Sequence, residues 1–375
     1  MTHLDLSAPV EDLAKALVDM PSVSGNEDRI ADAVERALTG HAHLDVVRLG
    51  NSIVARTHLG RAQRVAIAGH LDTVPITGNV PGWWSPEGEL VGRGSVDMKA
   101  GIAVQLSLAA ALTAPRRDVT WIFYDQEEVE AERNGLGRLA RERPDLIRAD
   151  FAVLCEPTQG VIEGGCNGTL RAEVTVHGVA SHSARAWKGV NAIHGAAPLL
   201  AALAAHQPED VEVDGLVFRE GLNAVGIRGG IAGNVIPDAC TVTINYRFSP
   251  RWELDAAKAR VERFVHEAFA AAPEPAGGRR VSLVWTDESA AARPGLDVPL
   301  SREFVAAVAA TGVAEPRAKQ GWTDVARFGS LGIPAVNYGP GDPELAHHDD
   351  ERCPVEEIRL CRAGLEEWLT SRGGS

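Results

Sequence analysis

Four short, mostly apolar segments recur along the chain and predict buried β-strands. Each is four to six residues long and stops where polar or turn-forming residues begin. Segments with helical spacing lie between them, and this alternation of strands and helices favours an open α/β sheet. The four segments are Val65–Ala68, Val119–Tyr124, Asp150–Cys155 and Ile333–Tyr338.

The first 114 residues carry further signals of regular structure. Ser24, followed three residues later by Glu27, predicts a capping box that opens a helix through Ile30 and Leu38. Other elements are predicted at residues 8–20 (helix), 44–49 and 52–57 (strands), 78–88 (loop) and 98–114 (helix).

The middle of the chain has a different pattern and predicts a second domain. Its elements are expected at 169–176 (strand), 190–205 (helix), 224–231 and 240–248 (strands), 253–271 (helix) and 281–285 (strand). That order, βαββαβ, is ferredoxin-like. We therefore expect residues 169–285 to form an inserted α+β domain with a linker at Pro273–Gly278, and residues 1–168 and 286–375 to form a mixed-sheet α/β domain.

Composition narrows the class of protein. A chain of 375 residues with 45% hydrophobic and 23% charged residues is typical of a globular protein with two domains. It has neither an apolar run long enough for a membrane span nor a basic N-terminal leader pattern. Five cysteines without CxxC spacing predict reduced thiols and a cytoplasmic location. A net charge of −14 argues against nucleic acid as a partner, although local cations could still bind an anionic substrate.

Each predicted buried strand is followed by a histidine or a carboxylate. His70 follows the first, Glu127 and Glu128 the second, Glu156 the third, and His347 comes after the fourth. In an open α/β sheet, sites form outside the carboxyl ends of the strands. We therefore expect these side chains to meet at one edge of the sheet.

This set of side chains is typical of a metal centre. Two imidazoles and three carboxylates are too many ligands for one tetrahedral zinc but suit two ions that share a bridging carboxylate. Asp97, in the turn before the Ala-rich helix, is the expected bridge, fixed in place by the helix start. Mixed nitrogen and oxygen ligands favour Zn²⁺, or Co²⁺ or Mn²⁺ in its place. The candidate ligands are His70, Asp97, Glu128, Glu156 and His347.

Two further carboxylates have expected roles beside the metals. Asp72 lies two residues after His70 on the same side of an extended segment, so it can accept a hydrogen bond from one ring nitrogen while the other binds metal. Of the adjacent Glu127 and Glu128, one can bind metal while its neighbour takes a proton from water and passes it to the leaving amine.

Plainer interpretations exist for each of these residues. A strand end followed by a helix cap explains His70 and Asp97 without any metal, and most Glu-Glu pairs are a solvated helix face. His347 and His348 are adjacent in a loop, and the residues alone do not separate them. His182, in the inserted domain, could be an ordinary surface histidine.

The motifs, taken in order, resemble the metal-dependent aminoacylase and carboxypeptidase family of the M20 type. Its pattern is a histidine–x–aspartate, a Gly-x-Gly-x-x-Asp-x-Lys segment, Glu-Glu, a later glutamate and a late His-x-x-Asp/Asn-Glu. The matching segments here are His70–Asp72, Gly92–Lys99, Glu127-Glu128, Glu156 and His347–Glu351. In this pattern His347 takes the ligand position and His348 a variable one.

The resemblance implies a role for each matching residue. One zinc would be held by His70, Asp97 and Glu156, and the other by Asp97, Glu128 and His347. Glu127 would be the general acid/base, and Asp72 would orient His70. The inserted domain would be the family's lid, which makes the homodimer and carries His182 to stabilise the oxyanion in the partner's active site. Asn234, Arg247 and Thr323 match positions that meet substrate carboxylates or amides.

Within the family, several segments resemble the desuccinylases found in actinobacteria. The resemblance implies hydrolysis of N-succinyl-LL-2,6-diaminopimelate to succinate and LL-2,6-diaminopimelate, in the supply of lysine and cell-wall precursors. The sequence departs from better-studied desuccinylases at Cys166 and Asn167, where those enzymes carry arginines. The segments that carry the resemblance are Phe123–Glu128, Gly233–Asp238, Gly321–Val325 and Ala335–Pro343.

Three rival functions remain to be weighed. The nearest is the same chemistry on another N-acyl substrate, such as acetylornithine or a dipeptide. A metal-binding protein that has lost catalysis is disfavoured because every expected ligand and Glu127 are present. A dinucleotide-binding enzyme is disfavoured because no Gly-x-Gly-x-x-Gly turn follows the first strand.

Overall fold

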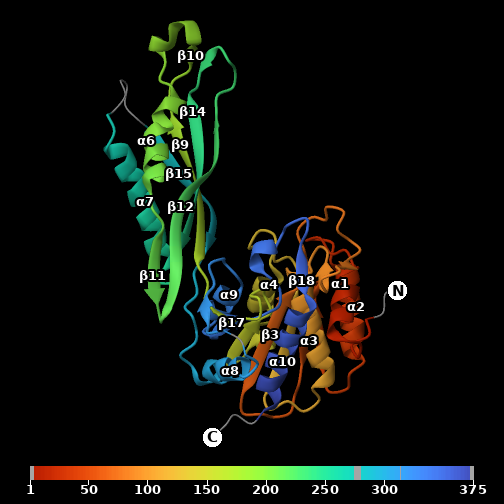
Figure 1. Cartoon of the computed structure of the whole chain (residues 1–375). Coiled ribbons are helices and arrows are strands. Elements are labelled where there is room, and N and C mark those ends of the chain that lie inside the picture. The colour runs from red at the N-terminus through yellow and green to blue at the C-terminus, as the bar shows by residue number, and fades with distance from the viewer. Residues whose placement is uncertain (1–3, 274–279, 313, 372–375) are drawn as a thin grey trace. The chain divides into compact units, whose positions relative to one another are not determined.

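The computed structural model describes residues 4–273, 280–312 and 314–371, which form two compact units (Figure 1). Unit 1 comprises residues 1–165, 294–318 and 323–375, and unit 2 comprises residues 166–293 and 319–322, each without the residues outside the described ranges. The predicted linker, Pro273–Gly278, lies outside those ranges except for Pro273. No described helix is both long and apolar enough to cross a membrane.

Unit 1 is built on a mixed sheet whose central strands are the predicted apolar segments. Among the described residues its order is β1-β2-β6-β3-β7-β17-β8-β16. The strands β6, β3, β7 and β17 are neighbours and all parallel, so their carboxyl ends lie at one edge. The bounds are β1 (Asp45–Leu49), β2 (Ser52–Arg56), β3 (Arg64–His70), β6 (Asp118–Tyr124), β7 (Phe151–Leu154), β8 (Glu163–Gly164), β16 (Arg317–Ala318) and β17 (Ala335–Asn337).

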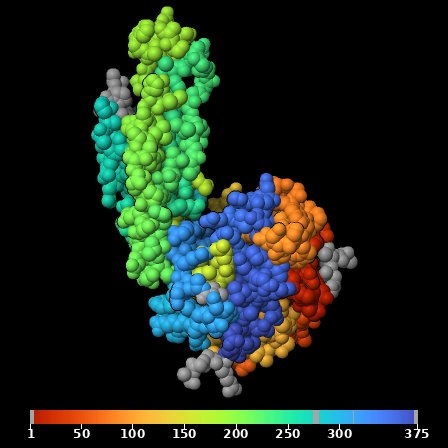
Figure 2. Space-filling view, viewed as in Figure 1, coloured from red at the N-terminus to blue at the C-terminus, as the bar shows by residue number. Residues whose placement is uncertain are grey.

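Helices cover both faces of this sheet. One face carries α1 (Val10–Val18), α2 (Asp28–Thr39), α3 (Lys99–Ala111), α8 (Pro299–Ala309) and α10 (Val355–Thr370), which pack on one another. Three further helices form the second helical layer and contact the strands of the sheet. They are α4 (Gly135–Glu142), α5 (Pro144–Ile147) and α9 (Val325–Ser330). Although they lie at opposite ends of the sequence, α1 and α10 pack together, and their segments share one surface in red and blue (Figure 2).

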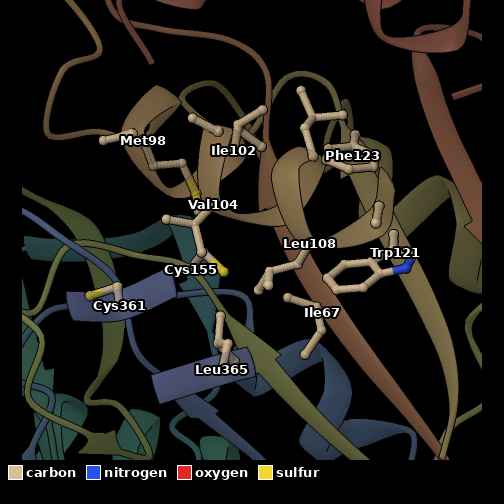
Figure 3. Packing of buried hydrophobic residues seen from close by; sticks show 14 of the residues in the cluster. Ile67, Met98, Ile102, Val104, Leu108, Trp121, Phe123, Cys155, Cys361 and Leu365 are labelled. Atoms are coloured by element: carbon tan, nitrogen blue, oxygen red, sulfur yellow. The ribbon is translucent and has the colours of Figure 1, made fainter. Parts of the chain in front are cut away.

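Helix α3 lies in the centre of the core and determines how closely the site's segments approach. Every residue from Lys99 to Ala109 is buried, which suits its apolar, Ala-rich sequence. Figure 3 shows its Ile102, Val104 and Leu108 among side chains of the sheet and of α10. A Cβ on Gly101 would lie 2.3 Å from the carbonyl oxygen of Cys155, so only glycine permits this approach to the end of β7.

Unit 2 is an antiparallel sheet with two helices on one face. The sheet order is β11-β12-β14-β9-β15, and α6 (Ala192–Ala205) and α7 (Leu254–Ala270) pack on it (Figure 1). The strands are β9 (Gly168–His177), β11 (Glu209–Val213), β12 (Leu216–Gly229), β14 (Ala239–Phe248) and β15 (Arg280–Ser289). Two short strands, β10 (Ser181–His182) and β13 (Val235–Ile236), pair as a small antiparallel ribbon. The 3₁₀ helix η1 (Ser183–Lys188) follows β10 and contacts both strands.

The expected α/β fold with a ferredoxin-like second part is confirmed, but three details were wrong. Ser24 and Glu27 do not form a capping box: α2 begins at Asp28, and the Ser24 hydroxyl donates to Asp72 instead. The predicted loop 78–88 contains β4 (Trp83–Trp84), which pairs with β5 (Glu89–Val91), itself paired with β18 (Arg352–Pro354). Strand β11 and the first part of β12 were missed because acidic residues dominate β11.

Candidate metal centre

The parallel strands of unit 1 deliver the predicted ligands to one edge of the sheet. His70 is the last residue of β3, Glu127 and Glu128 follow β6, and Glu156 follows β7. His347 follows the 3₁₀ helix η2 (Pro343–Leu345), which comes after β17. The chain after each parallel strand must leave the sheet at its carboxyl edge, so segments far apart in sequence meet there.

The side chains gather in overlapping groups that can each hold a metal ion. Within a group, one ligand atom of each residue lies within 4.8 Å of the others. Asp97 is common to the two groups that match the expected ligand sets, whereas a third group brings Glu127 within reach. The groups are His70, Asp97 and Glu156; Asp97, Glu128 and His347; and His70, Glu127 and Glu128.

Asp97 contacts a histidine with each of its carboxylate oxygens. Its Oδ1 lies 3.0 Å from Nε2 of His70, and its Oδ2 lies 3.3 Å from Nε2 of His347. The same nitrogen of His347 lies 2.9 Å from Oε1 of Glu128. A carboxylate with one oxygen directed to each of two ligand groups has the arrangement that a bridging ligand requires.

Asp72 supports both His70 and the pair of glutamates. Nδ1 of His70 lies 3.0 Å from the carbonyl oxygen of Asp72, while the nearest carboxylate oxygen is 3.5 Å away, so the expected hydrogen bond goes to the backbone. The Asp72 carboxylate accepts hydrogen bonds from the backbone N–H groups of Glu127 (3.0 Å) and Glu128 (3.1 Å) and from the Ser24 hydroxyl (2.7 Å). These donors draw the carboxylate away from the ring.

Glu351 holds the turn that contains Asp97, a role that the sequence did not reveal. Its buried carboxylate accepts backbone hydrogen bonds from Gly94, Val96 and Asp97 at 2.9–3.0 Å and pairs with Arg93 at 3.0 Å. The helix start does not fix Asp97 as we expected, because Met98 is the N-cap of α3 and no side chain caps it. The sequence did offer one signal for this role: Glu351 ends the His347–Glu351 motif, and no function had been assigned to its carboxylate.

The electrostatics of the cluster favour added positive charge. Hydrogen bonds that the His347 ring donates to the Asp97 and Glu128 carboxylates raise the pKa of His347 to about 10. Burial raises the pKa of Glu127 well above its ordinary value, and burial together with Asp97 raises that of Glu128. Burial opposes ionisation of Asp97 too, but His347 and His70 hold its pKa below the usual range. Gathered carboxylates need cationic partners, and a divalent ion can take the place of the histidine protons.

Two residues of the site adopt backbone conformations that are unusual for side chains with a Cβ. Gln126, immediately before Glu127, has φ of 58°, and His347 has φ of 68°. Non-glycine residues in this left-handed region are strained and occur most often at functional sites. The surrounding hydrogen bonds to Asp72 and Glu128 therefore hold these segments where the donor atoms converge.

The remaining predicted residues lie outside this cluster. His182, Asn234 and Arg247 belong to unit 2 and are exposed. Nδ1 of His182 accepts a hydrogen bond from the backbone N–H of Ala184 at 3.0 Å. Thr323, in unit 1, is buried, and its hydroxyl lies 2.8 Å from Oδ1 of Asn337.

Comparison with known proteins identifies the family of the chain. The model of peptidase family M20/M25/M40 matches residues 66–371. The chain belongs to the M20 peptidase family. Among M20 relatives, the succinyl-diaminopimelate desuccinylase of Corynebacterium glutamicum is 44% identical, with 98% of each chain covered. A Mycobacterium tuberculosis protein that bears this name provisionally is 50% identical over 98% of this chain and 99% of its own.

The M20 fold also agrees with solved structures. A tripeptidase from Staphylococcus aureus covers 98% of this chain and 98% of its own with a TM-score of 0.80 at 19% identity. At this identity the likeness concerns the fold alone. The fold predicted from the sequence, a mixed-sheet α/β unit joined to an α+β unit, is therefore that of the M20 family.

Proposed function

We propose that the chain is an amide hydrolase that converts N-succinyl-LL-2,6-diaminopimelate and water to LL-2,6-diaminopimelate and succinate. The observation that carries this proposal is full-length identity of 44–50% to proteins named succinyl-diaminopimelate desuccinylase. The cluster of histidines and carboxylates in unit 1 supplies side chains suited to such a hydrolysis.

The donor set fits two transition-metal ions. His70, Asp97 and Glu156 would hold one ion, and Asp97, Glu128 and His347 the other, with Asp97 shared. Imidazole nitrogen together with carboxylate oxygen suits Zn²⁺, or Co²⁺ or Mn²⁺, better than Mg²⁺ or Ca²⁺. Ions bound there would polarise the scissile carbonyl and lower the pKa of a water towards neutrality.

Glu127 is the proposed general acid/base. Glu128 contacts His347 at 2.9 Å and is therefore the better ligand of the second ion, which leaves Glu127 to move the proton. Its raised pKa suits a group that must first accept a proton from water and then release it to the leaving amine. Asp72 orients His70 and holds the backbone of Glu127 and Glu128 in place.

In this proposal, assembly rests on the middle of the chain, and recognition rests on the middle together with Thr323. In this proposal residues 169–285 form a lid that makes a homodimer, and residues 1–168 and 286–375 carry the chemistry. His182 stabilises the oxyanion, and Asn234, Arg247 and Thr323 contact substrate carboxylates or amides. Exposed apolar side chains of unit 2, among them Val225 and Ile227 on β12, suit burial against a second copy. The buried cysteines suit reduced thiols and a cytoplasmic enzyme.

The test compares two substrates with protein prepared in two ways. N-succinyl-LL-diaminopimelate and N-acetylornithine are offered to zinc-loaded and chelator-treated protein. We expect zinc-dependent release of succinate and little turnover of the acetyl compound. Turnover of N-acetylornithine alone would keep the hydrolytic site but contradict the substrate, and equal activity after complete metal removal would contradict the metal centre.

A further inference from the structure

The five-stranded sheet of unit 2 has one covered face and one open face. Leu170, Ala172 and Val174 of β9 point into the core formed with α6 and α7. Residues alternate between faces along a strand, so Thr169 and Arg171 lie on the other side. On β14 the same alternation places Asn245 and Arg247 on that open face, because Ile244, Tyr246 and Phe248 are in the core.

The strand register makes these four residues neighbours. Arg247 pairs with Thr169, and Asn245 pairs with Arg171. Arg171 and Arg247 are therefore diagonal neighbours, whose Cα atoms lie roughly 7–8 Å apart in such sheets, so two long side chains can converge on one group. The Asn245 amide donates to the Thr169 hydroxyl at 3.0 Å, which leaves the hydroxyl proton able to donate in turn.

These two guanidinium groups have less acidic compensation than two other arginines of unit 2, Arg228 and Arg251. Arg228 pairs with Glu173 at 2.6 Å, and Arg251 pairs with Glu220 at 2.9 Å. In the part of the chain that the structure describes, Arg171 pairs with Asp287 at 3.8 Å, which is beyond hydrogen-bonding distance. Among the described residues, no carboxylate forms an ion pair with Arg247. Burial and the charge of Arg171 lower the pKa of Arg247, and the nearby charge of Asp287 opposes this shift without reversing it.

Cations brought together in this way suit a carboxylate that has no ammonium group beside it. A guanidinium binds a carboxylate through two parallel hydrogen bonds. The free amino-acid end of diaminopimelate carries an ammonium next to its carboxylate, which two neighbouring cations would repel. The succinyl carboxylate and the carboxylate on the acylated carbon both lack such an ammonium.

We propose that Arg171 and Arg247 together form an anion subsite for a substrate carboxylate without a neighbouring ammonium, with Arg171 as an additional specificity-determining residue. This inference rests on the proposed function for the identity of the substrate. Cys166 and Asn167, which precede β9, cannot supply this charge: Cys166 is a buried thiol, and the Asn167 amide donates to the carbonyl oxygens of Arg219 and Gln320.

The kinetic test uses Arg171→Gln, Arg171→Lys and a control, Arg228→Gln, whose arginine lies on the same sheet but is already paired. We expect Arg171→Gln to raise KM for N-succinyl-LL-diaminopimelate roughly ten- to hundredfold with kcat little changed, because a charged hydrogen-bonding partner is lost. Arg171→Lys should recover part of the loss, and Arg228→Gln should behave as the unaltered chain. An unchanged KM in Arg171→Gln, or an equal rise in the control, would overturn the subsite.

N-acetyl-LL-diaminopimelate separates the two possible carboxylates. A rise in KM confined to the succinyl compound would assign the subsite to the acyl carboxylate, and a rise for both would assign it to the carboxylate on the acylated carbon. Calorimetric titration with succinate and with N-acetyl-LL-diaminopimelate needs no turnover. If either compound binds Arg171→Gln more weakly than it binds the unaltered chain, the subsite is supported even if the reaction is different. If each compound binds the variant and the unaltered chain equally well, the subsite is overturned.

Discussion

The two units hold their candidate functional residues in different ways. In unit 1, His70 and Asp72 are fully buried at a strand end, and each touches another member of the cluster. In unit 2, His182, Arg171 and Arg247 lie on exposed surfaces. The difference matches the two proposed tasks: bond cleavage needs donors fixed to a fraction of an ångström, whereas charged side chains that recognise a carboxylate can adapt.

Each unit also has a buried glutamate that accepts several hydrogen bonds, and the two glutamates differ in what they hold in place. Glu351 in unit 1 holds the turn that presents Asp97, so it connects stability with the site. Glu220, on β12 of unit 2, accepts from Tyr246 of β14 and from Ser249 and Arg251, which follow that strand. Variants of the site residues in unit 1 should therefore change catalysis or metal binding, and Glu351 variants the stability of the turn, whereas Glu220 variants should change only the stability of unit 2.

The largest effect is expected at Glu127. Glu127→Ala removes the proposed proton carrier and should lower kcat about 10²–10⁴-fold while zinc still binds. The measurement is steady-state hydrolysis together with zinc content after dialysis. Glu130→Ala, a change at an exposed neighbour, is the matched control and should be close to the unaltered chain. A near-native rate in Glu127→Ala would remove this residue from the mechanism.

Next comes Glu351. Glu351→Gln removes the close, buried ion pair of Arg93, leaving it Asp349 at 3.9 Å, and places an amide N–H₂ against backbone donors, so unfolding should become easier by about 3–5 kcal/mol. Urea unfolding of the metal-free protein measures this loss. Glu356→Gln, at an exposed surface pair, should change the free energy by less than about 0.5 kcal/mol. Equal stability of the two variants would contradict the anchoring role.

A smaller effect is expected at Asp72. Asp72→Asn cannot accept from both backbone N–H groups of Glu127 and Glu128, so it should weaken zinc binding or activity about 10–100-fold. Competition with a chelating dye gives the zinc affinity. Asp32→Asn, on the surface beside Arg48, is the control. If both variants bind zinc and turn over substrate equally well, the Asp72 carboxylate has no supporting role.

The smallest effect is a pH dependence in unit 2. Burial alone would raise the pKa of Glu220, but hydrogen bonds from Ser249 and Arg251 outweigh it and hold the pKa below its usual 4.5. A lowered folded-state pKa adds stability above pH 4.5 that is lost as the pH falls through the folded value. Glu220→Gln should therefore flatten the acid side of the stability curve by no more than about 1.4 kcal/mol per pH unit. Denaturant melts at several acid pH values give the free energy of unfolding. The same dependence of this free energy on pH in Glu220→Gln and in the unaltered chain would contradict the prediction.

The elements that position the centre could be predicted because their signals are local. The apolar segments that became β3, β6, β7 and β17 are continuous in sequence, and parallel strands must release their next residues at the same edge. That is why the sequence alone could place His70, Glu128 and Glu156 together.

The supporting contacts could not be predicted because they join residues far apart in the chain. Ser24 reaches Asp72, 48 residues away, and Glu351 reaches Gly94, 257 residues away. No local pattern distinguishes such a serine from a helix cap, which is why the capping box was wrong. Strand β11 was missed for a different reason: only Val211 and Val213 of its residues are buried, so its apolar signal is short.

The central claim is that the unit 1 cluster performs metal-dependent hydrolysis, and adding zinc back to metal-free protein tests it most directly. Hydrolysis of N-succinyl-LL-diaminopimelate is followed as zinc is titrated in, with bound zinc measured in parallel. The account predicts no turnover without metal and a rate that rises until about two ions are bound per chain. Full turnover by protein shown to contain no metal would contradict it.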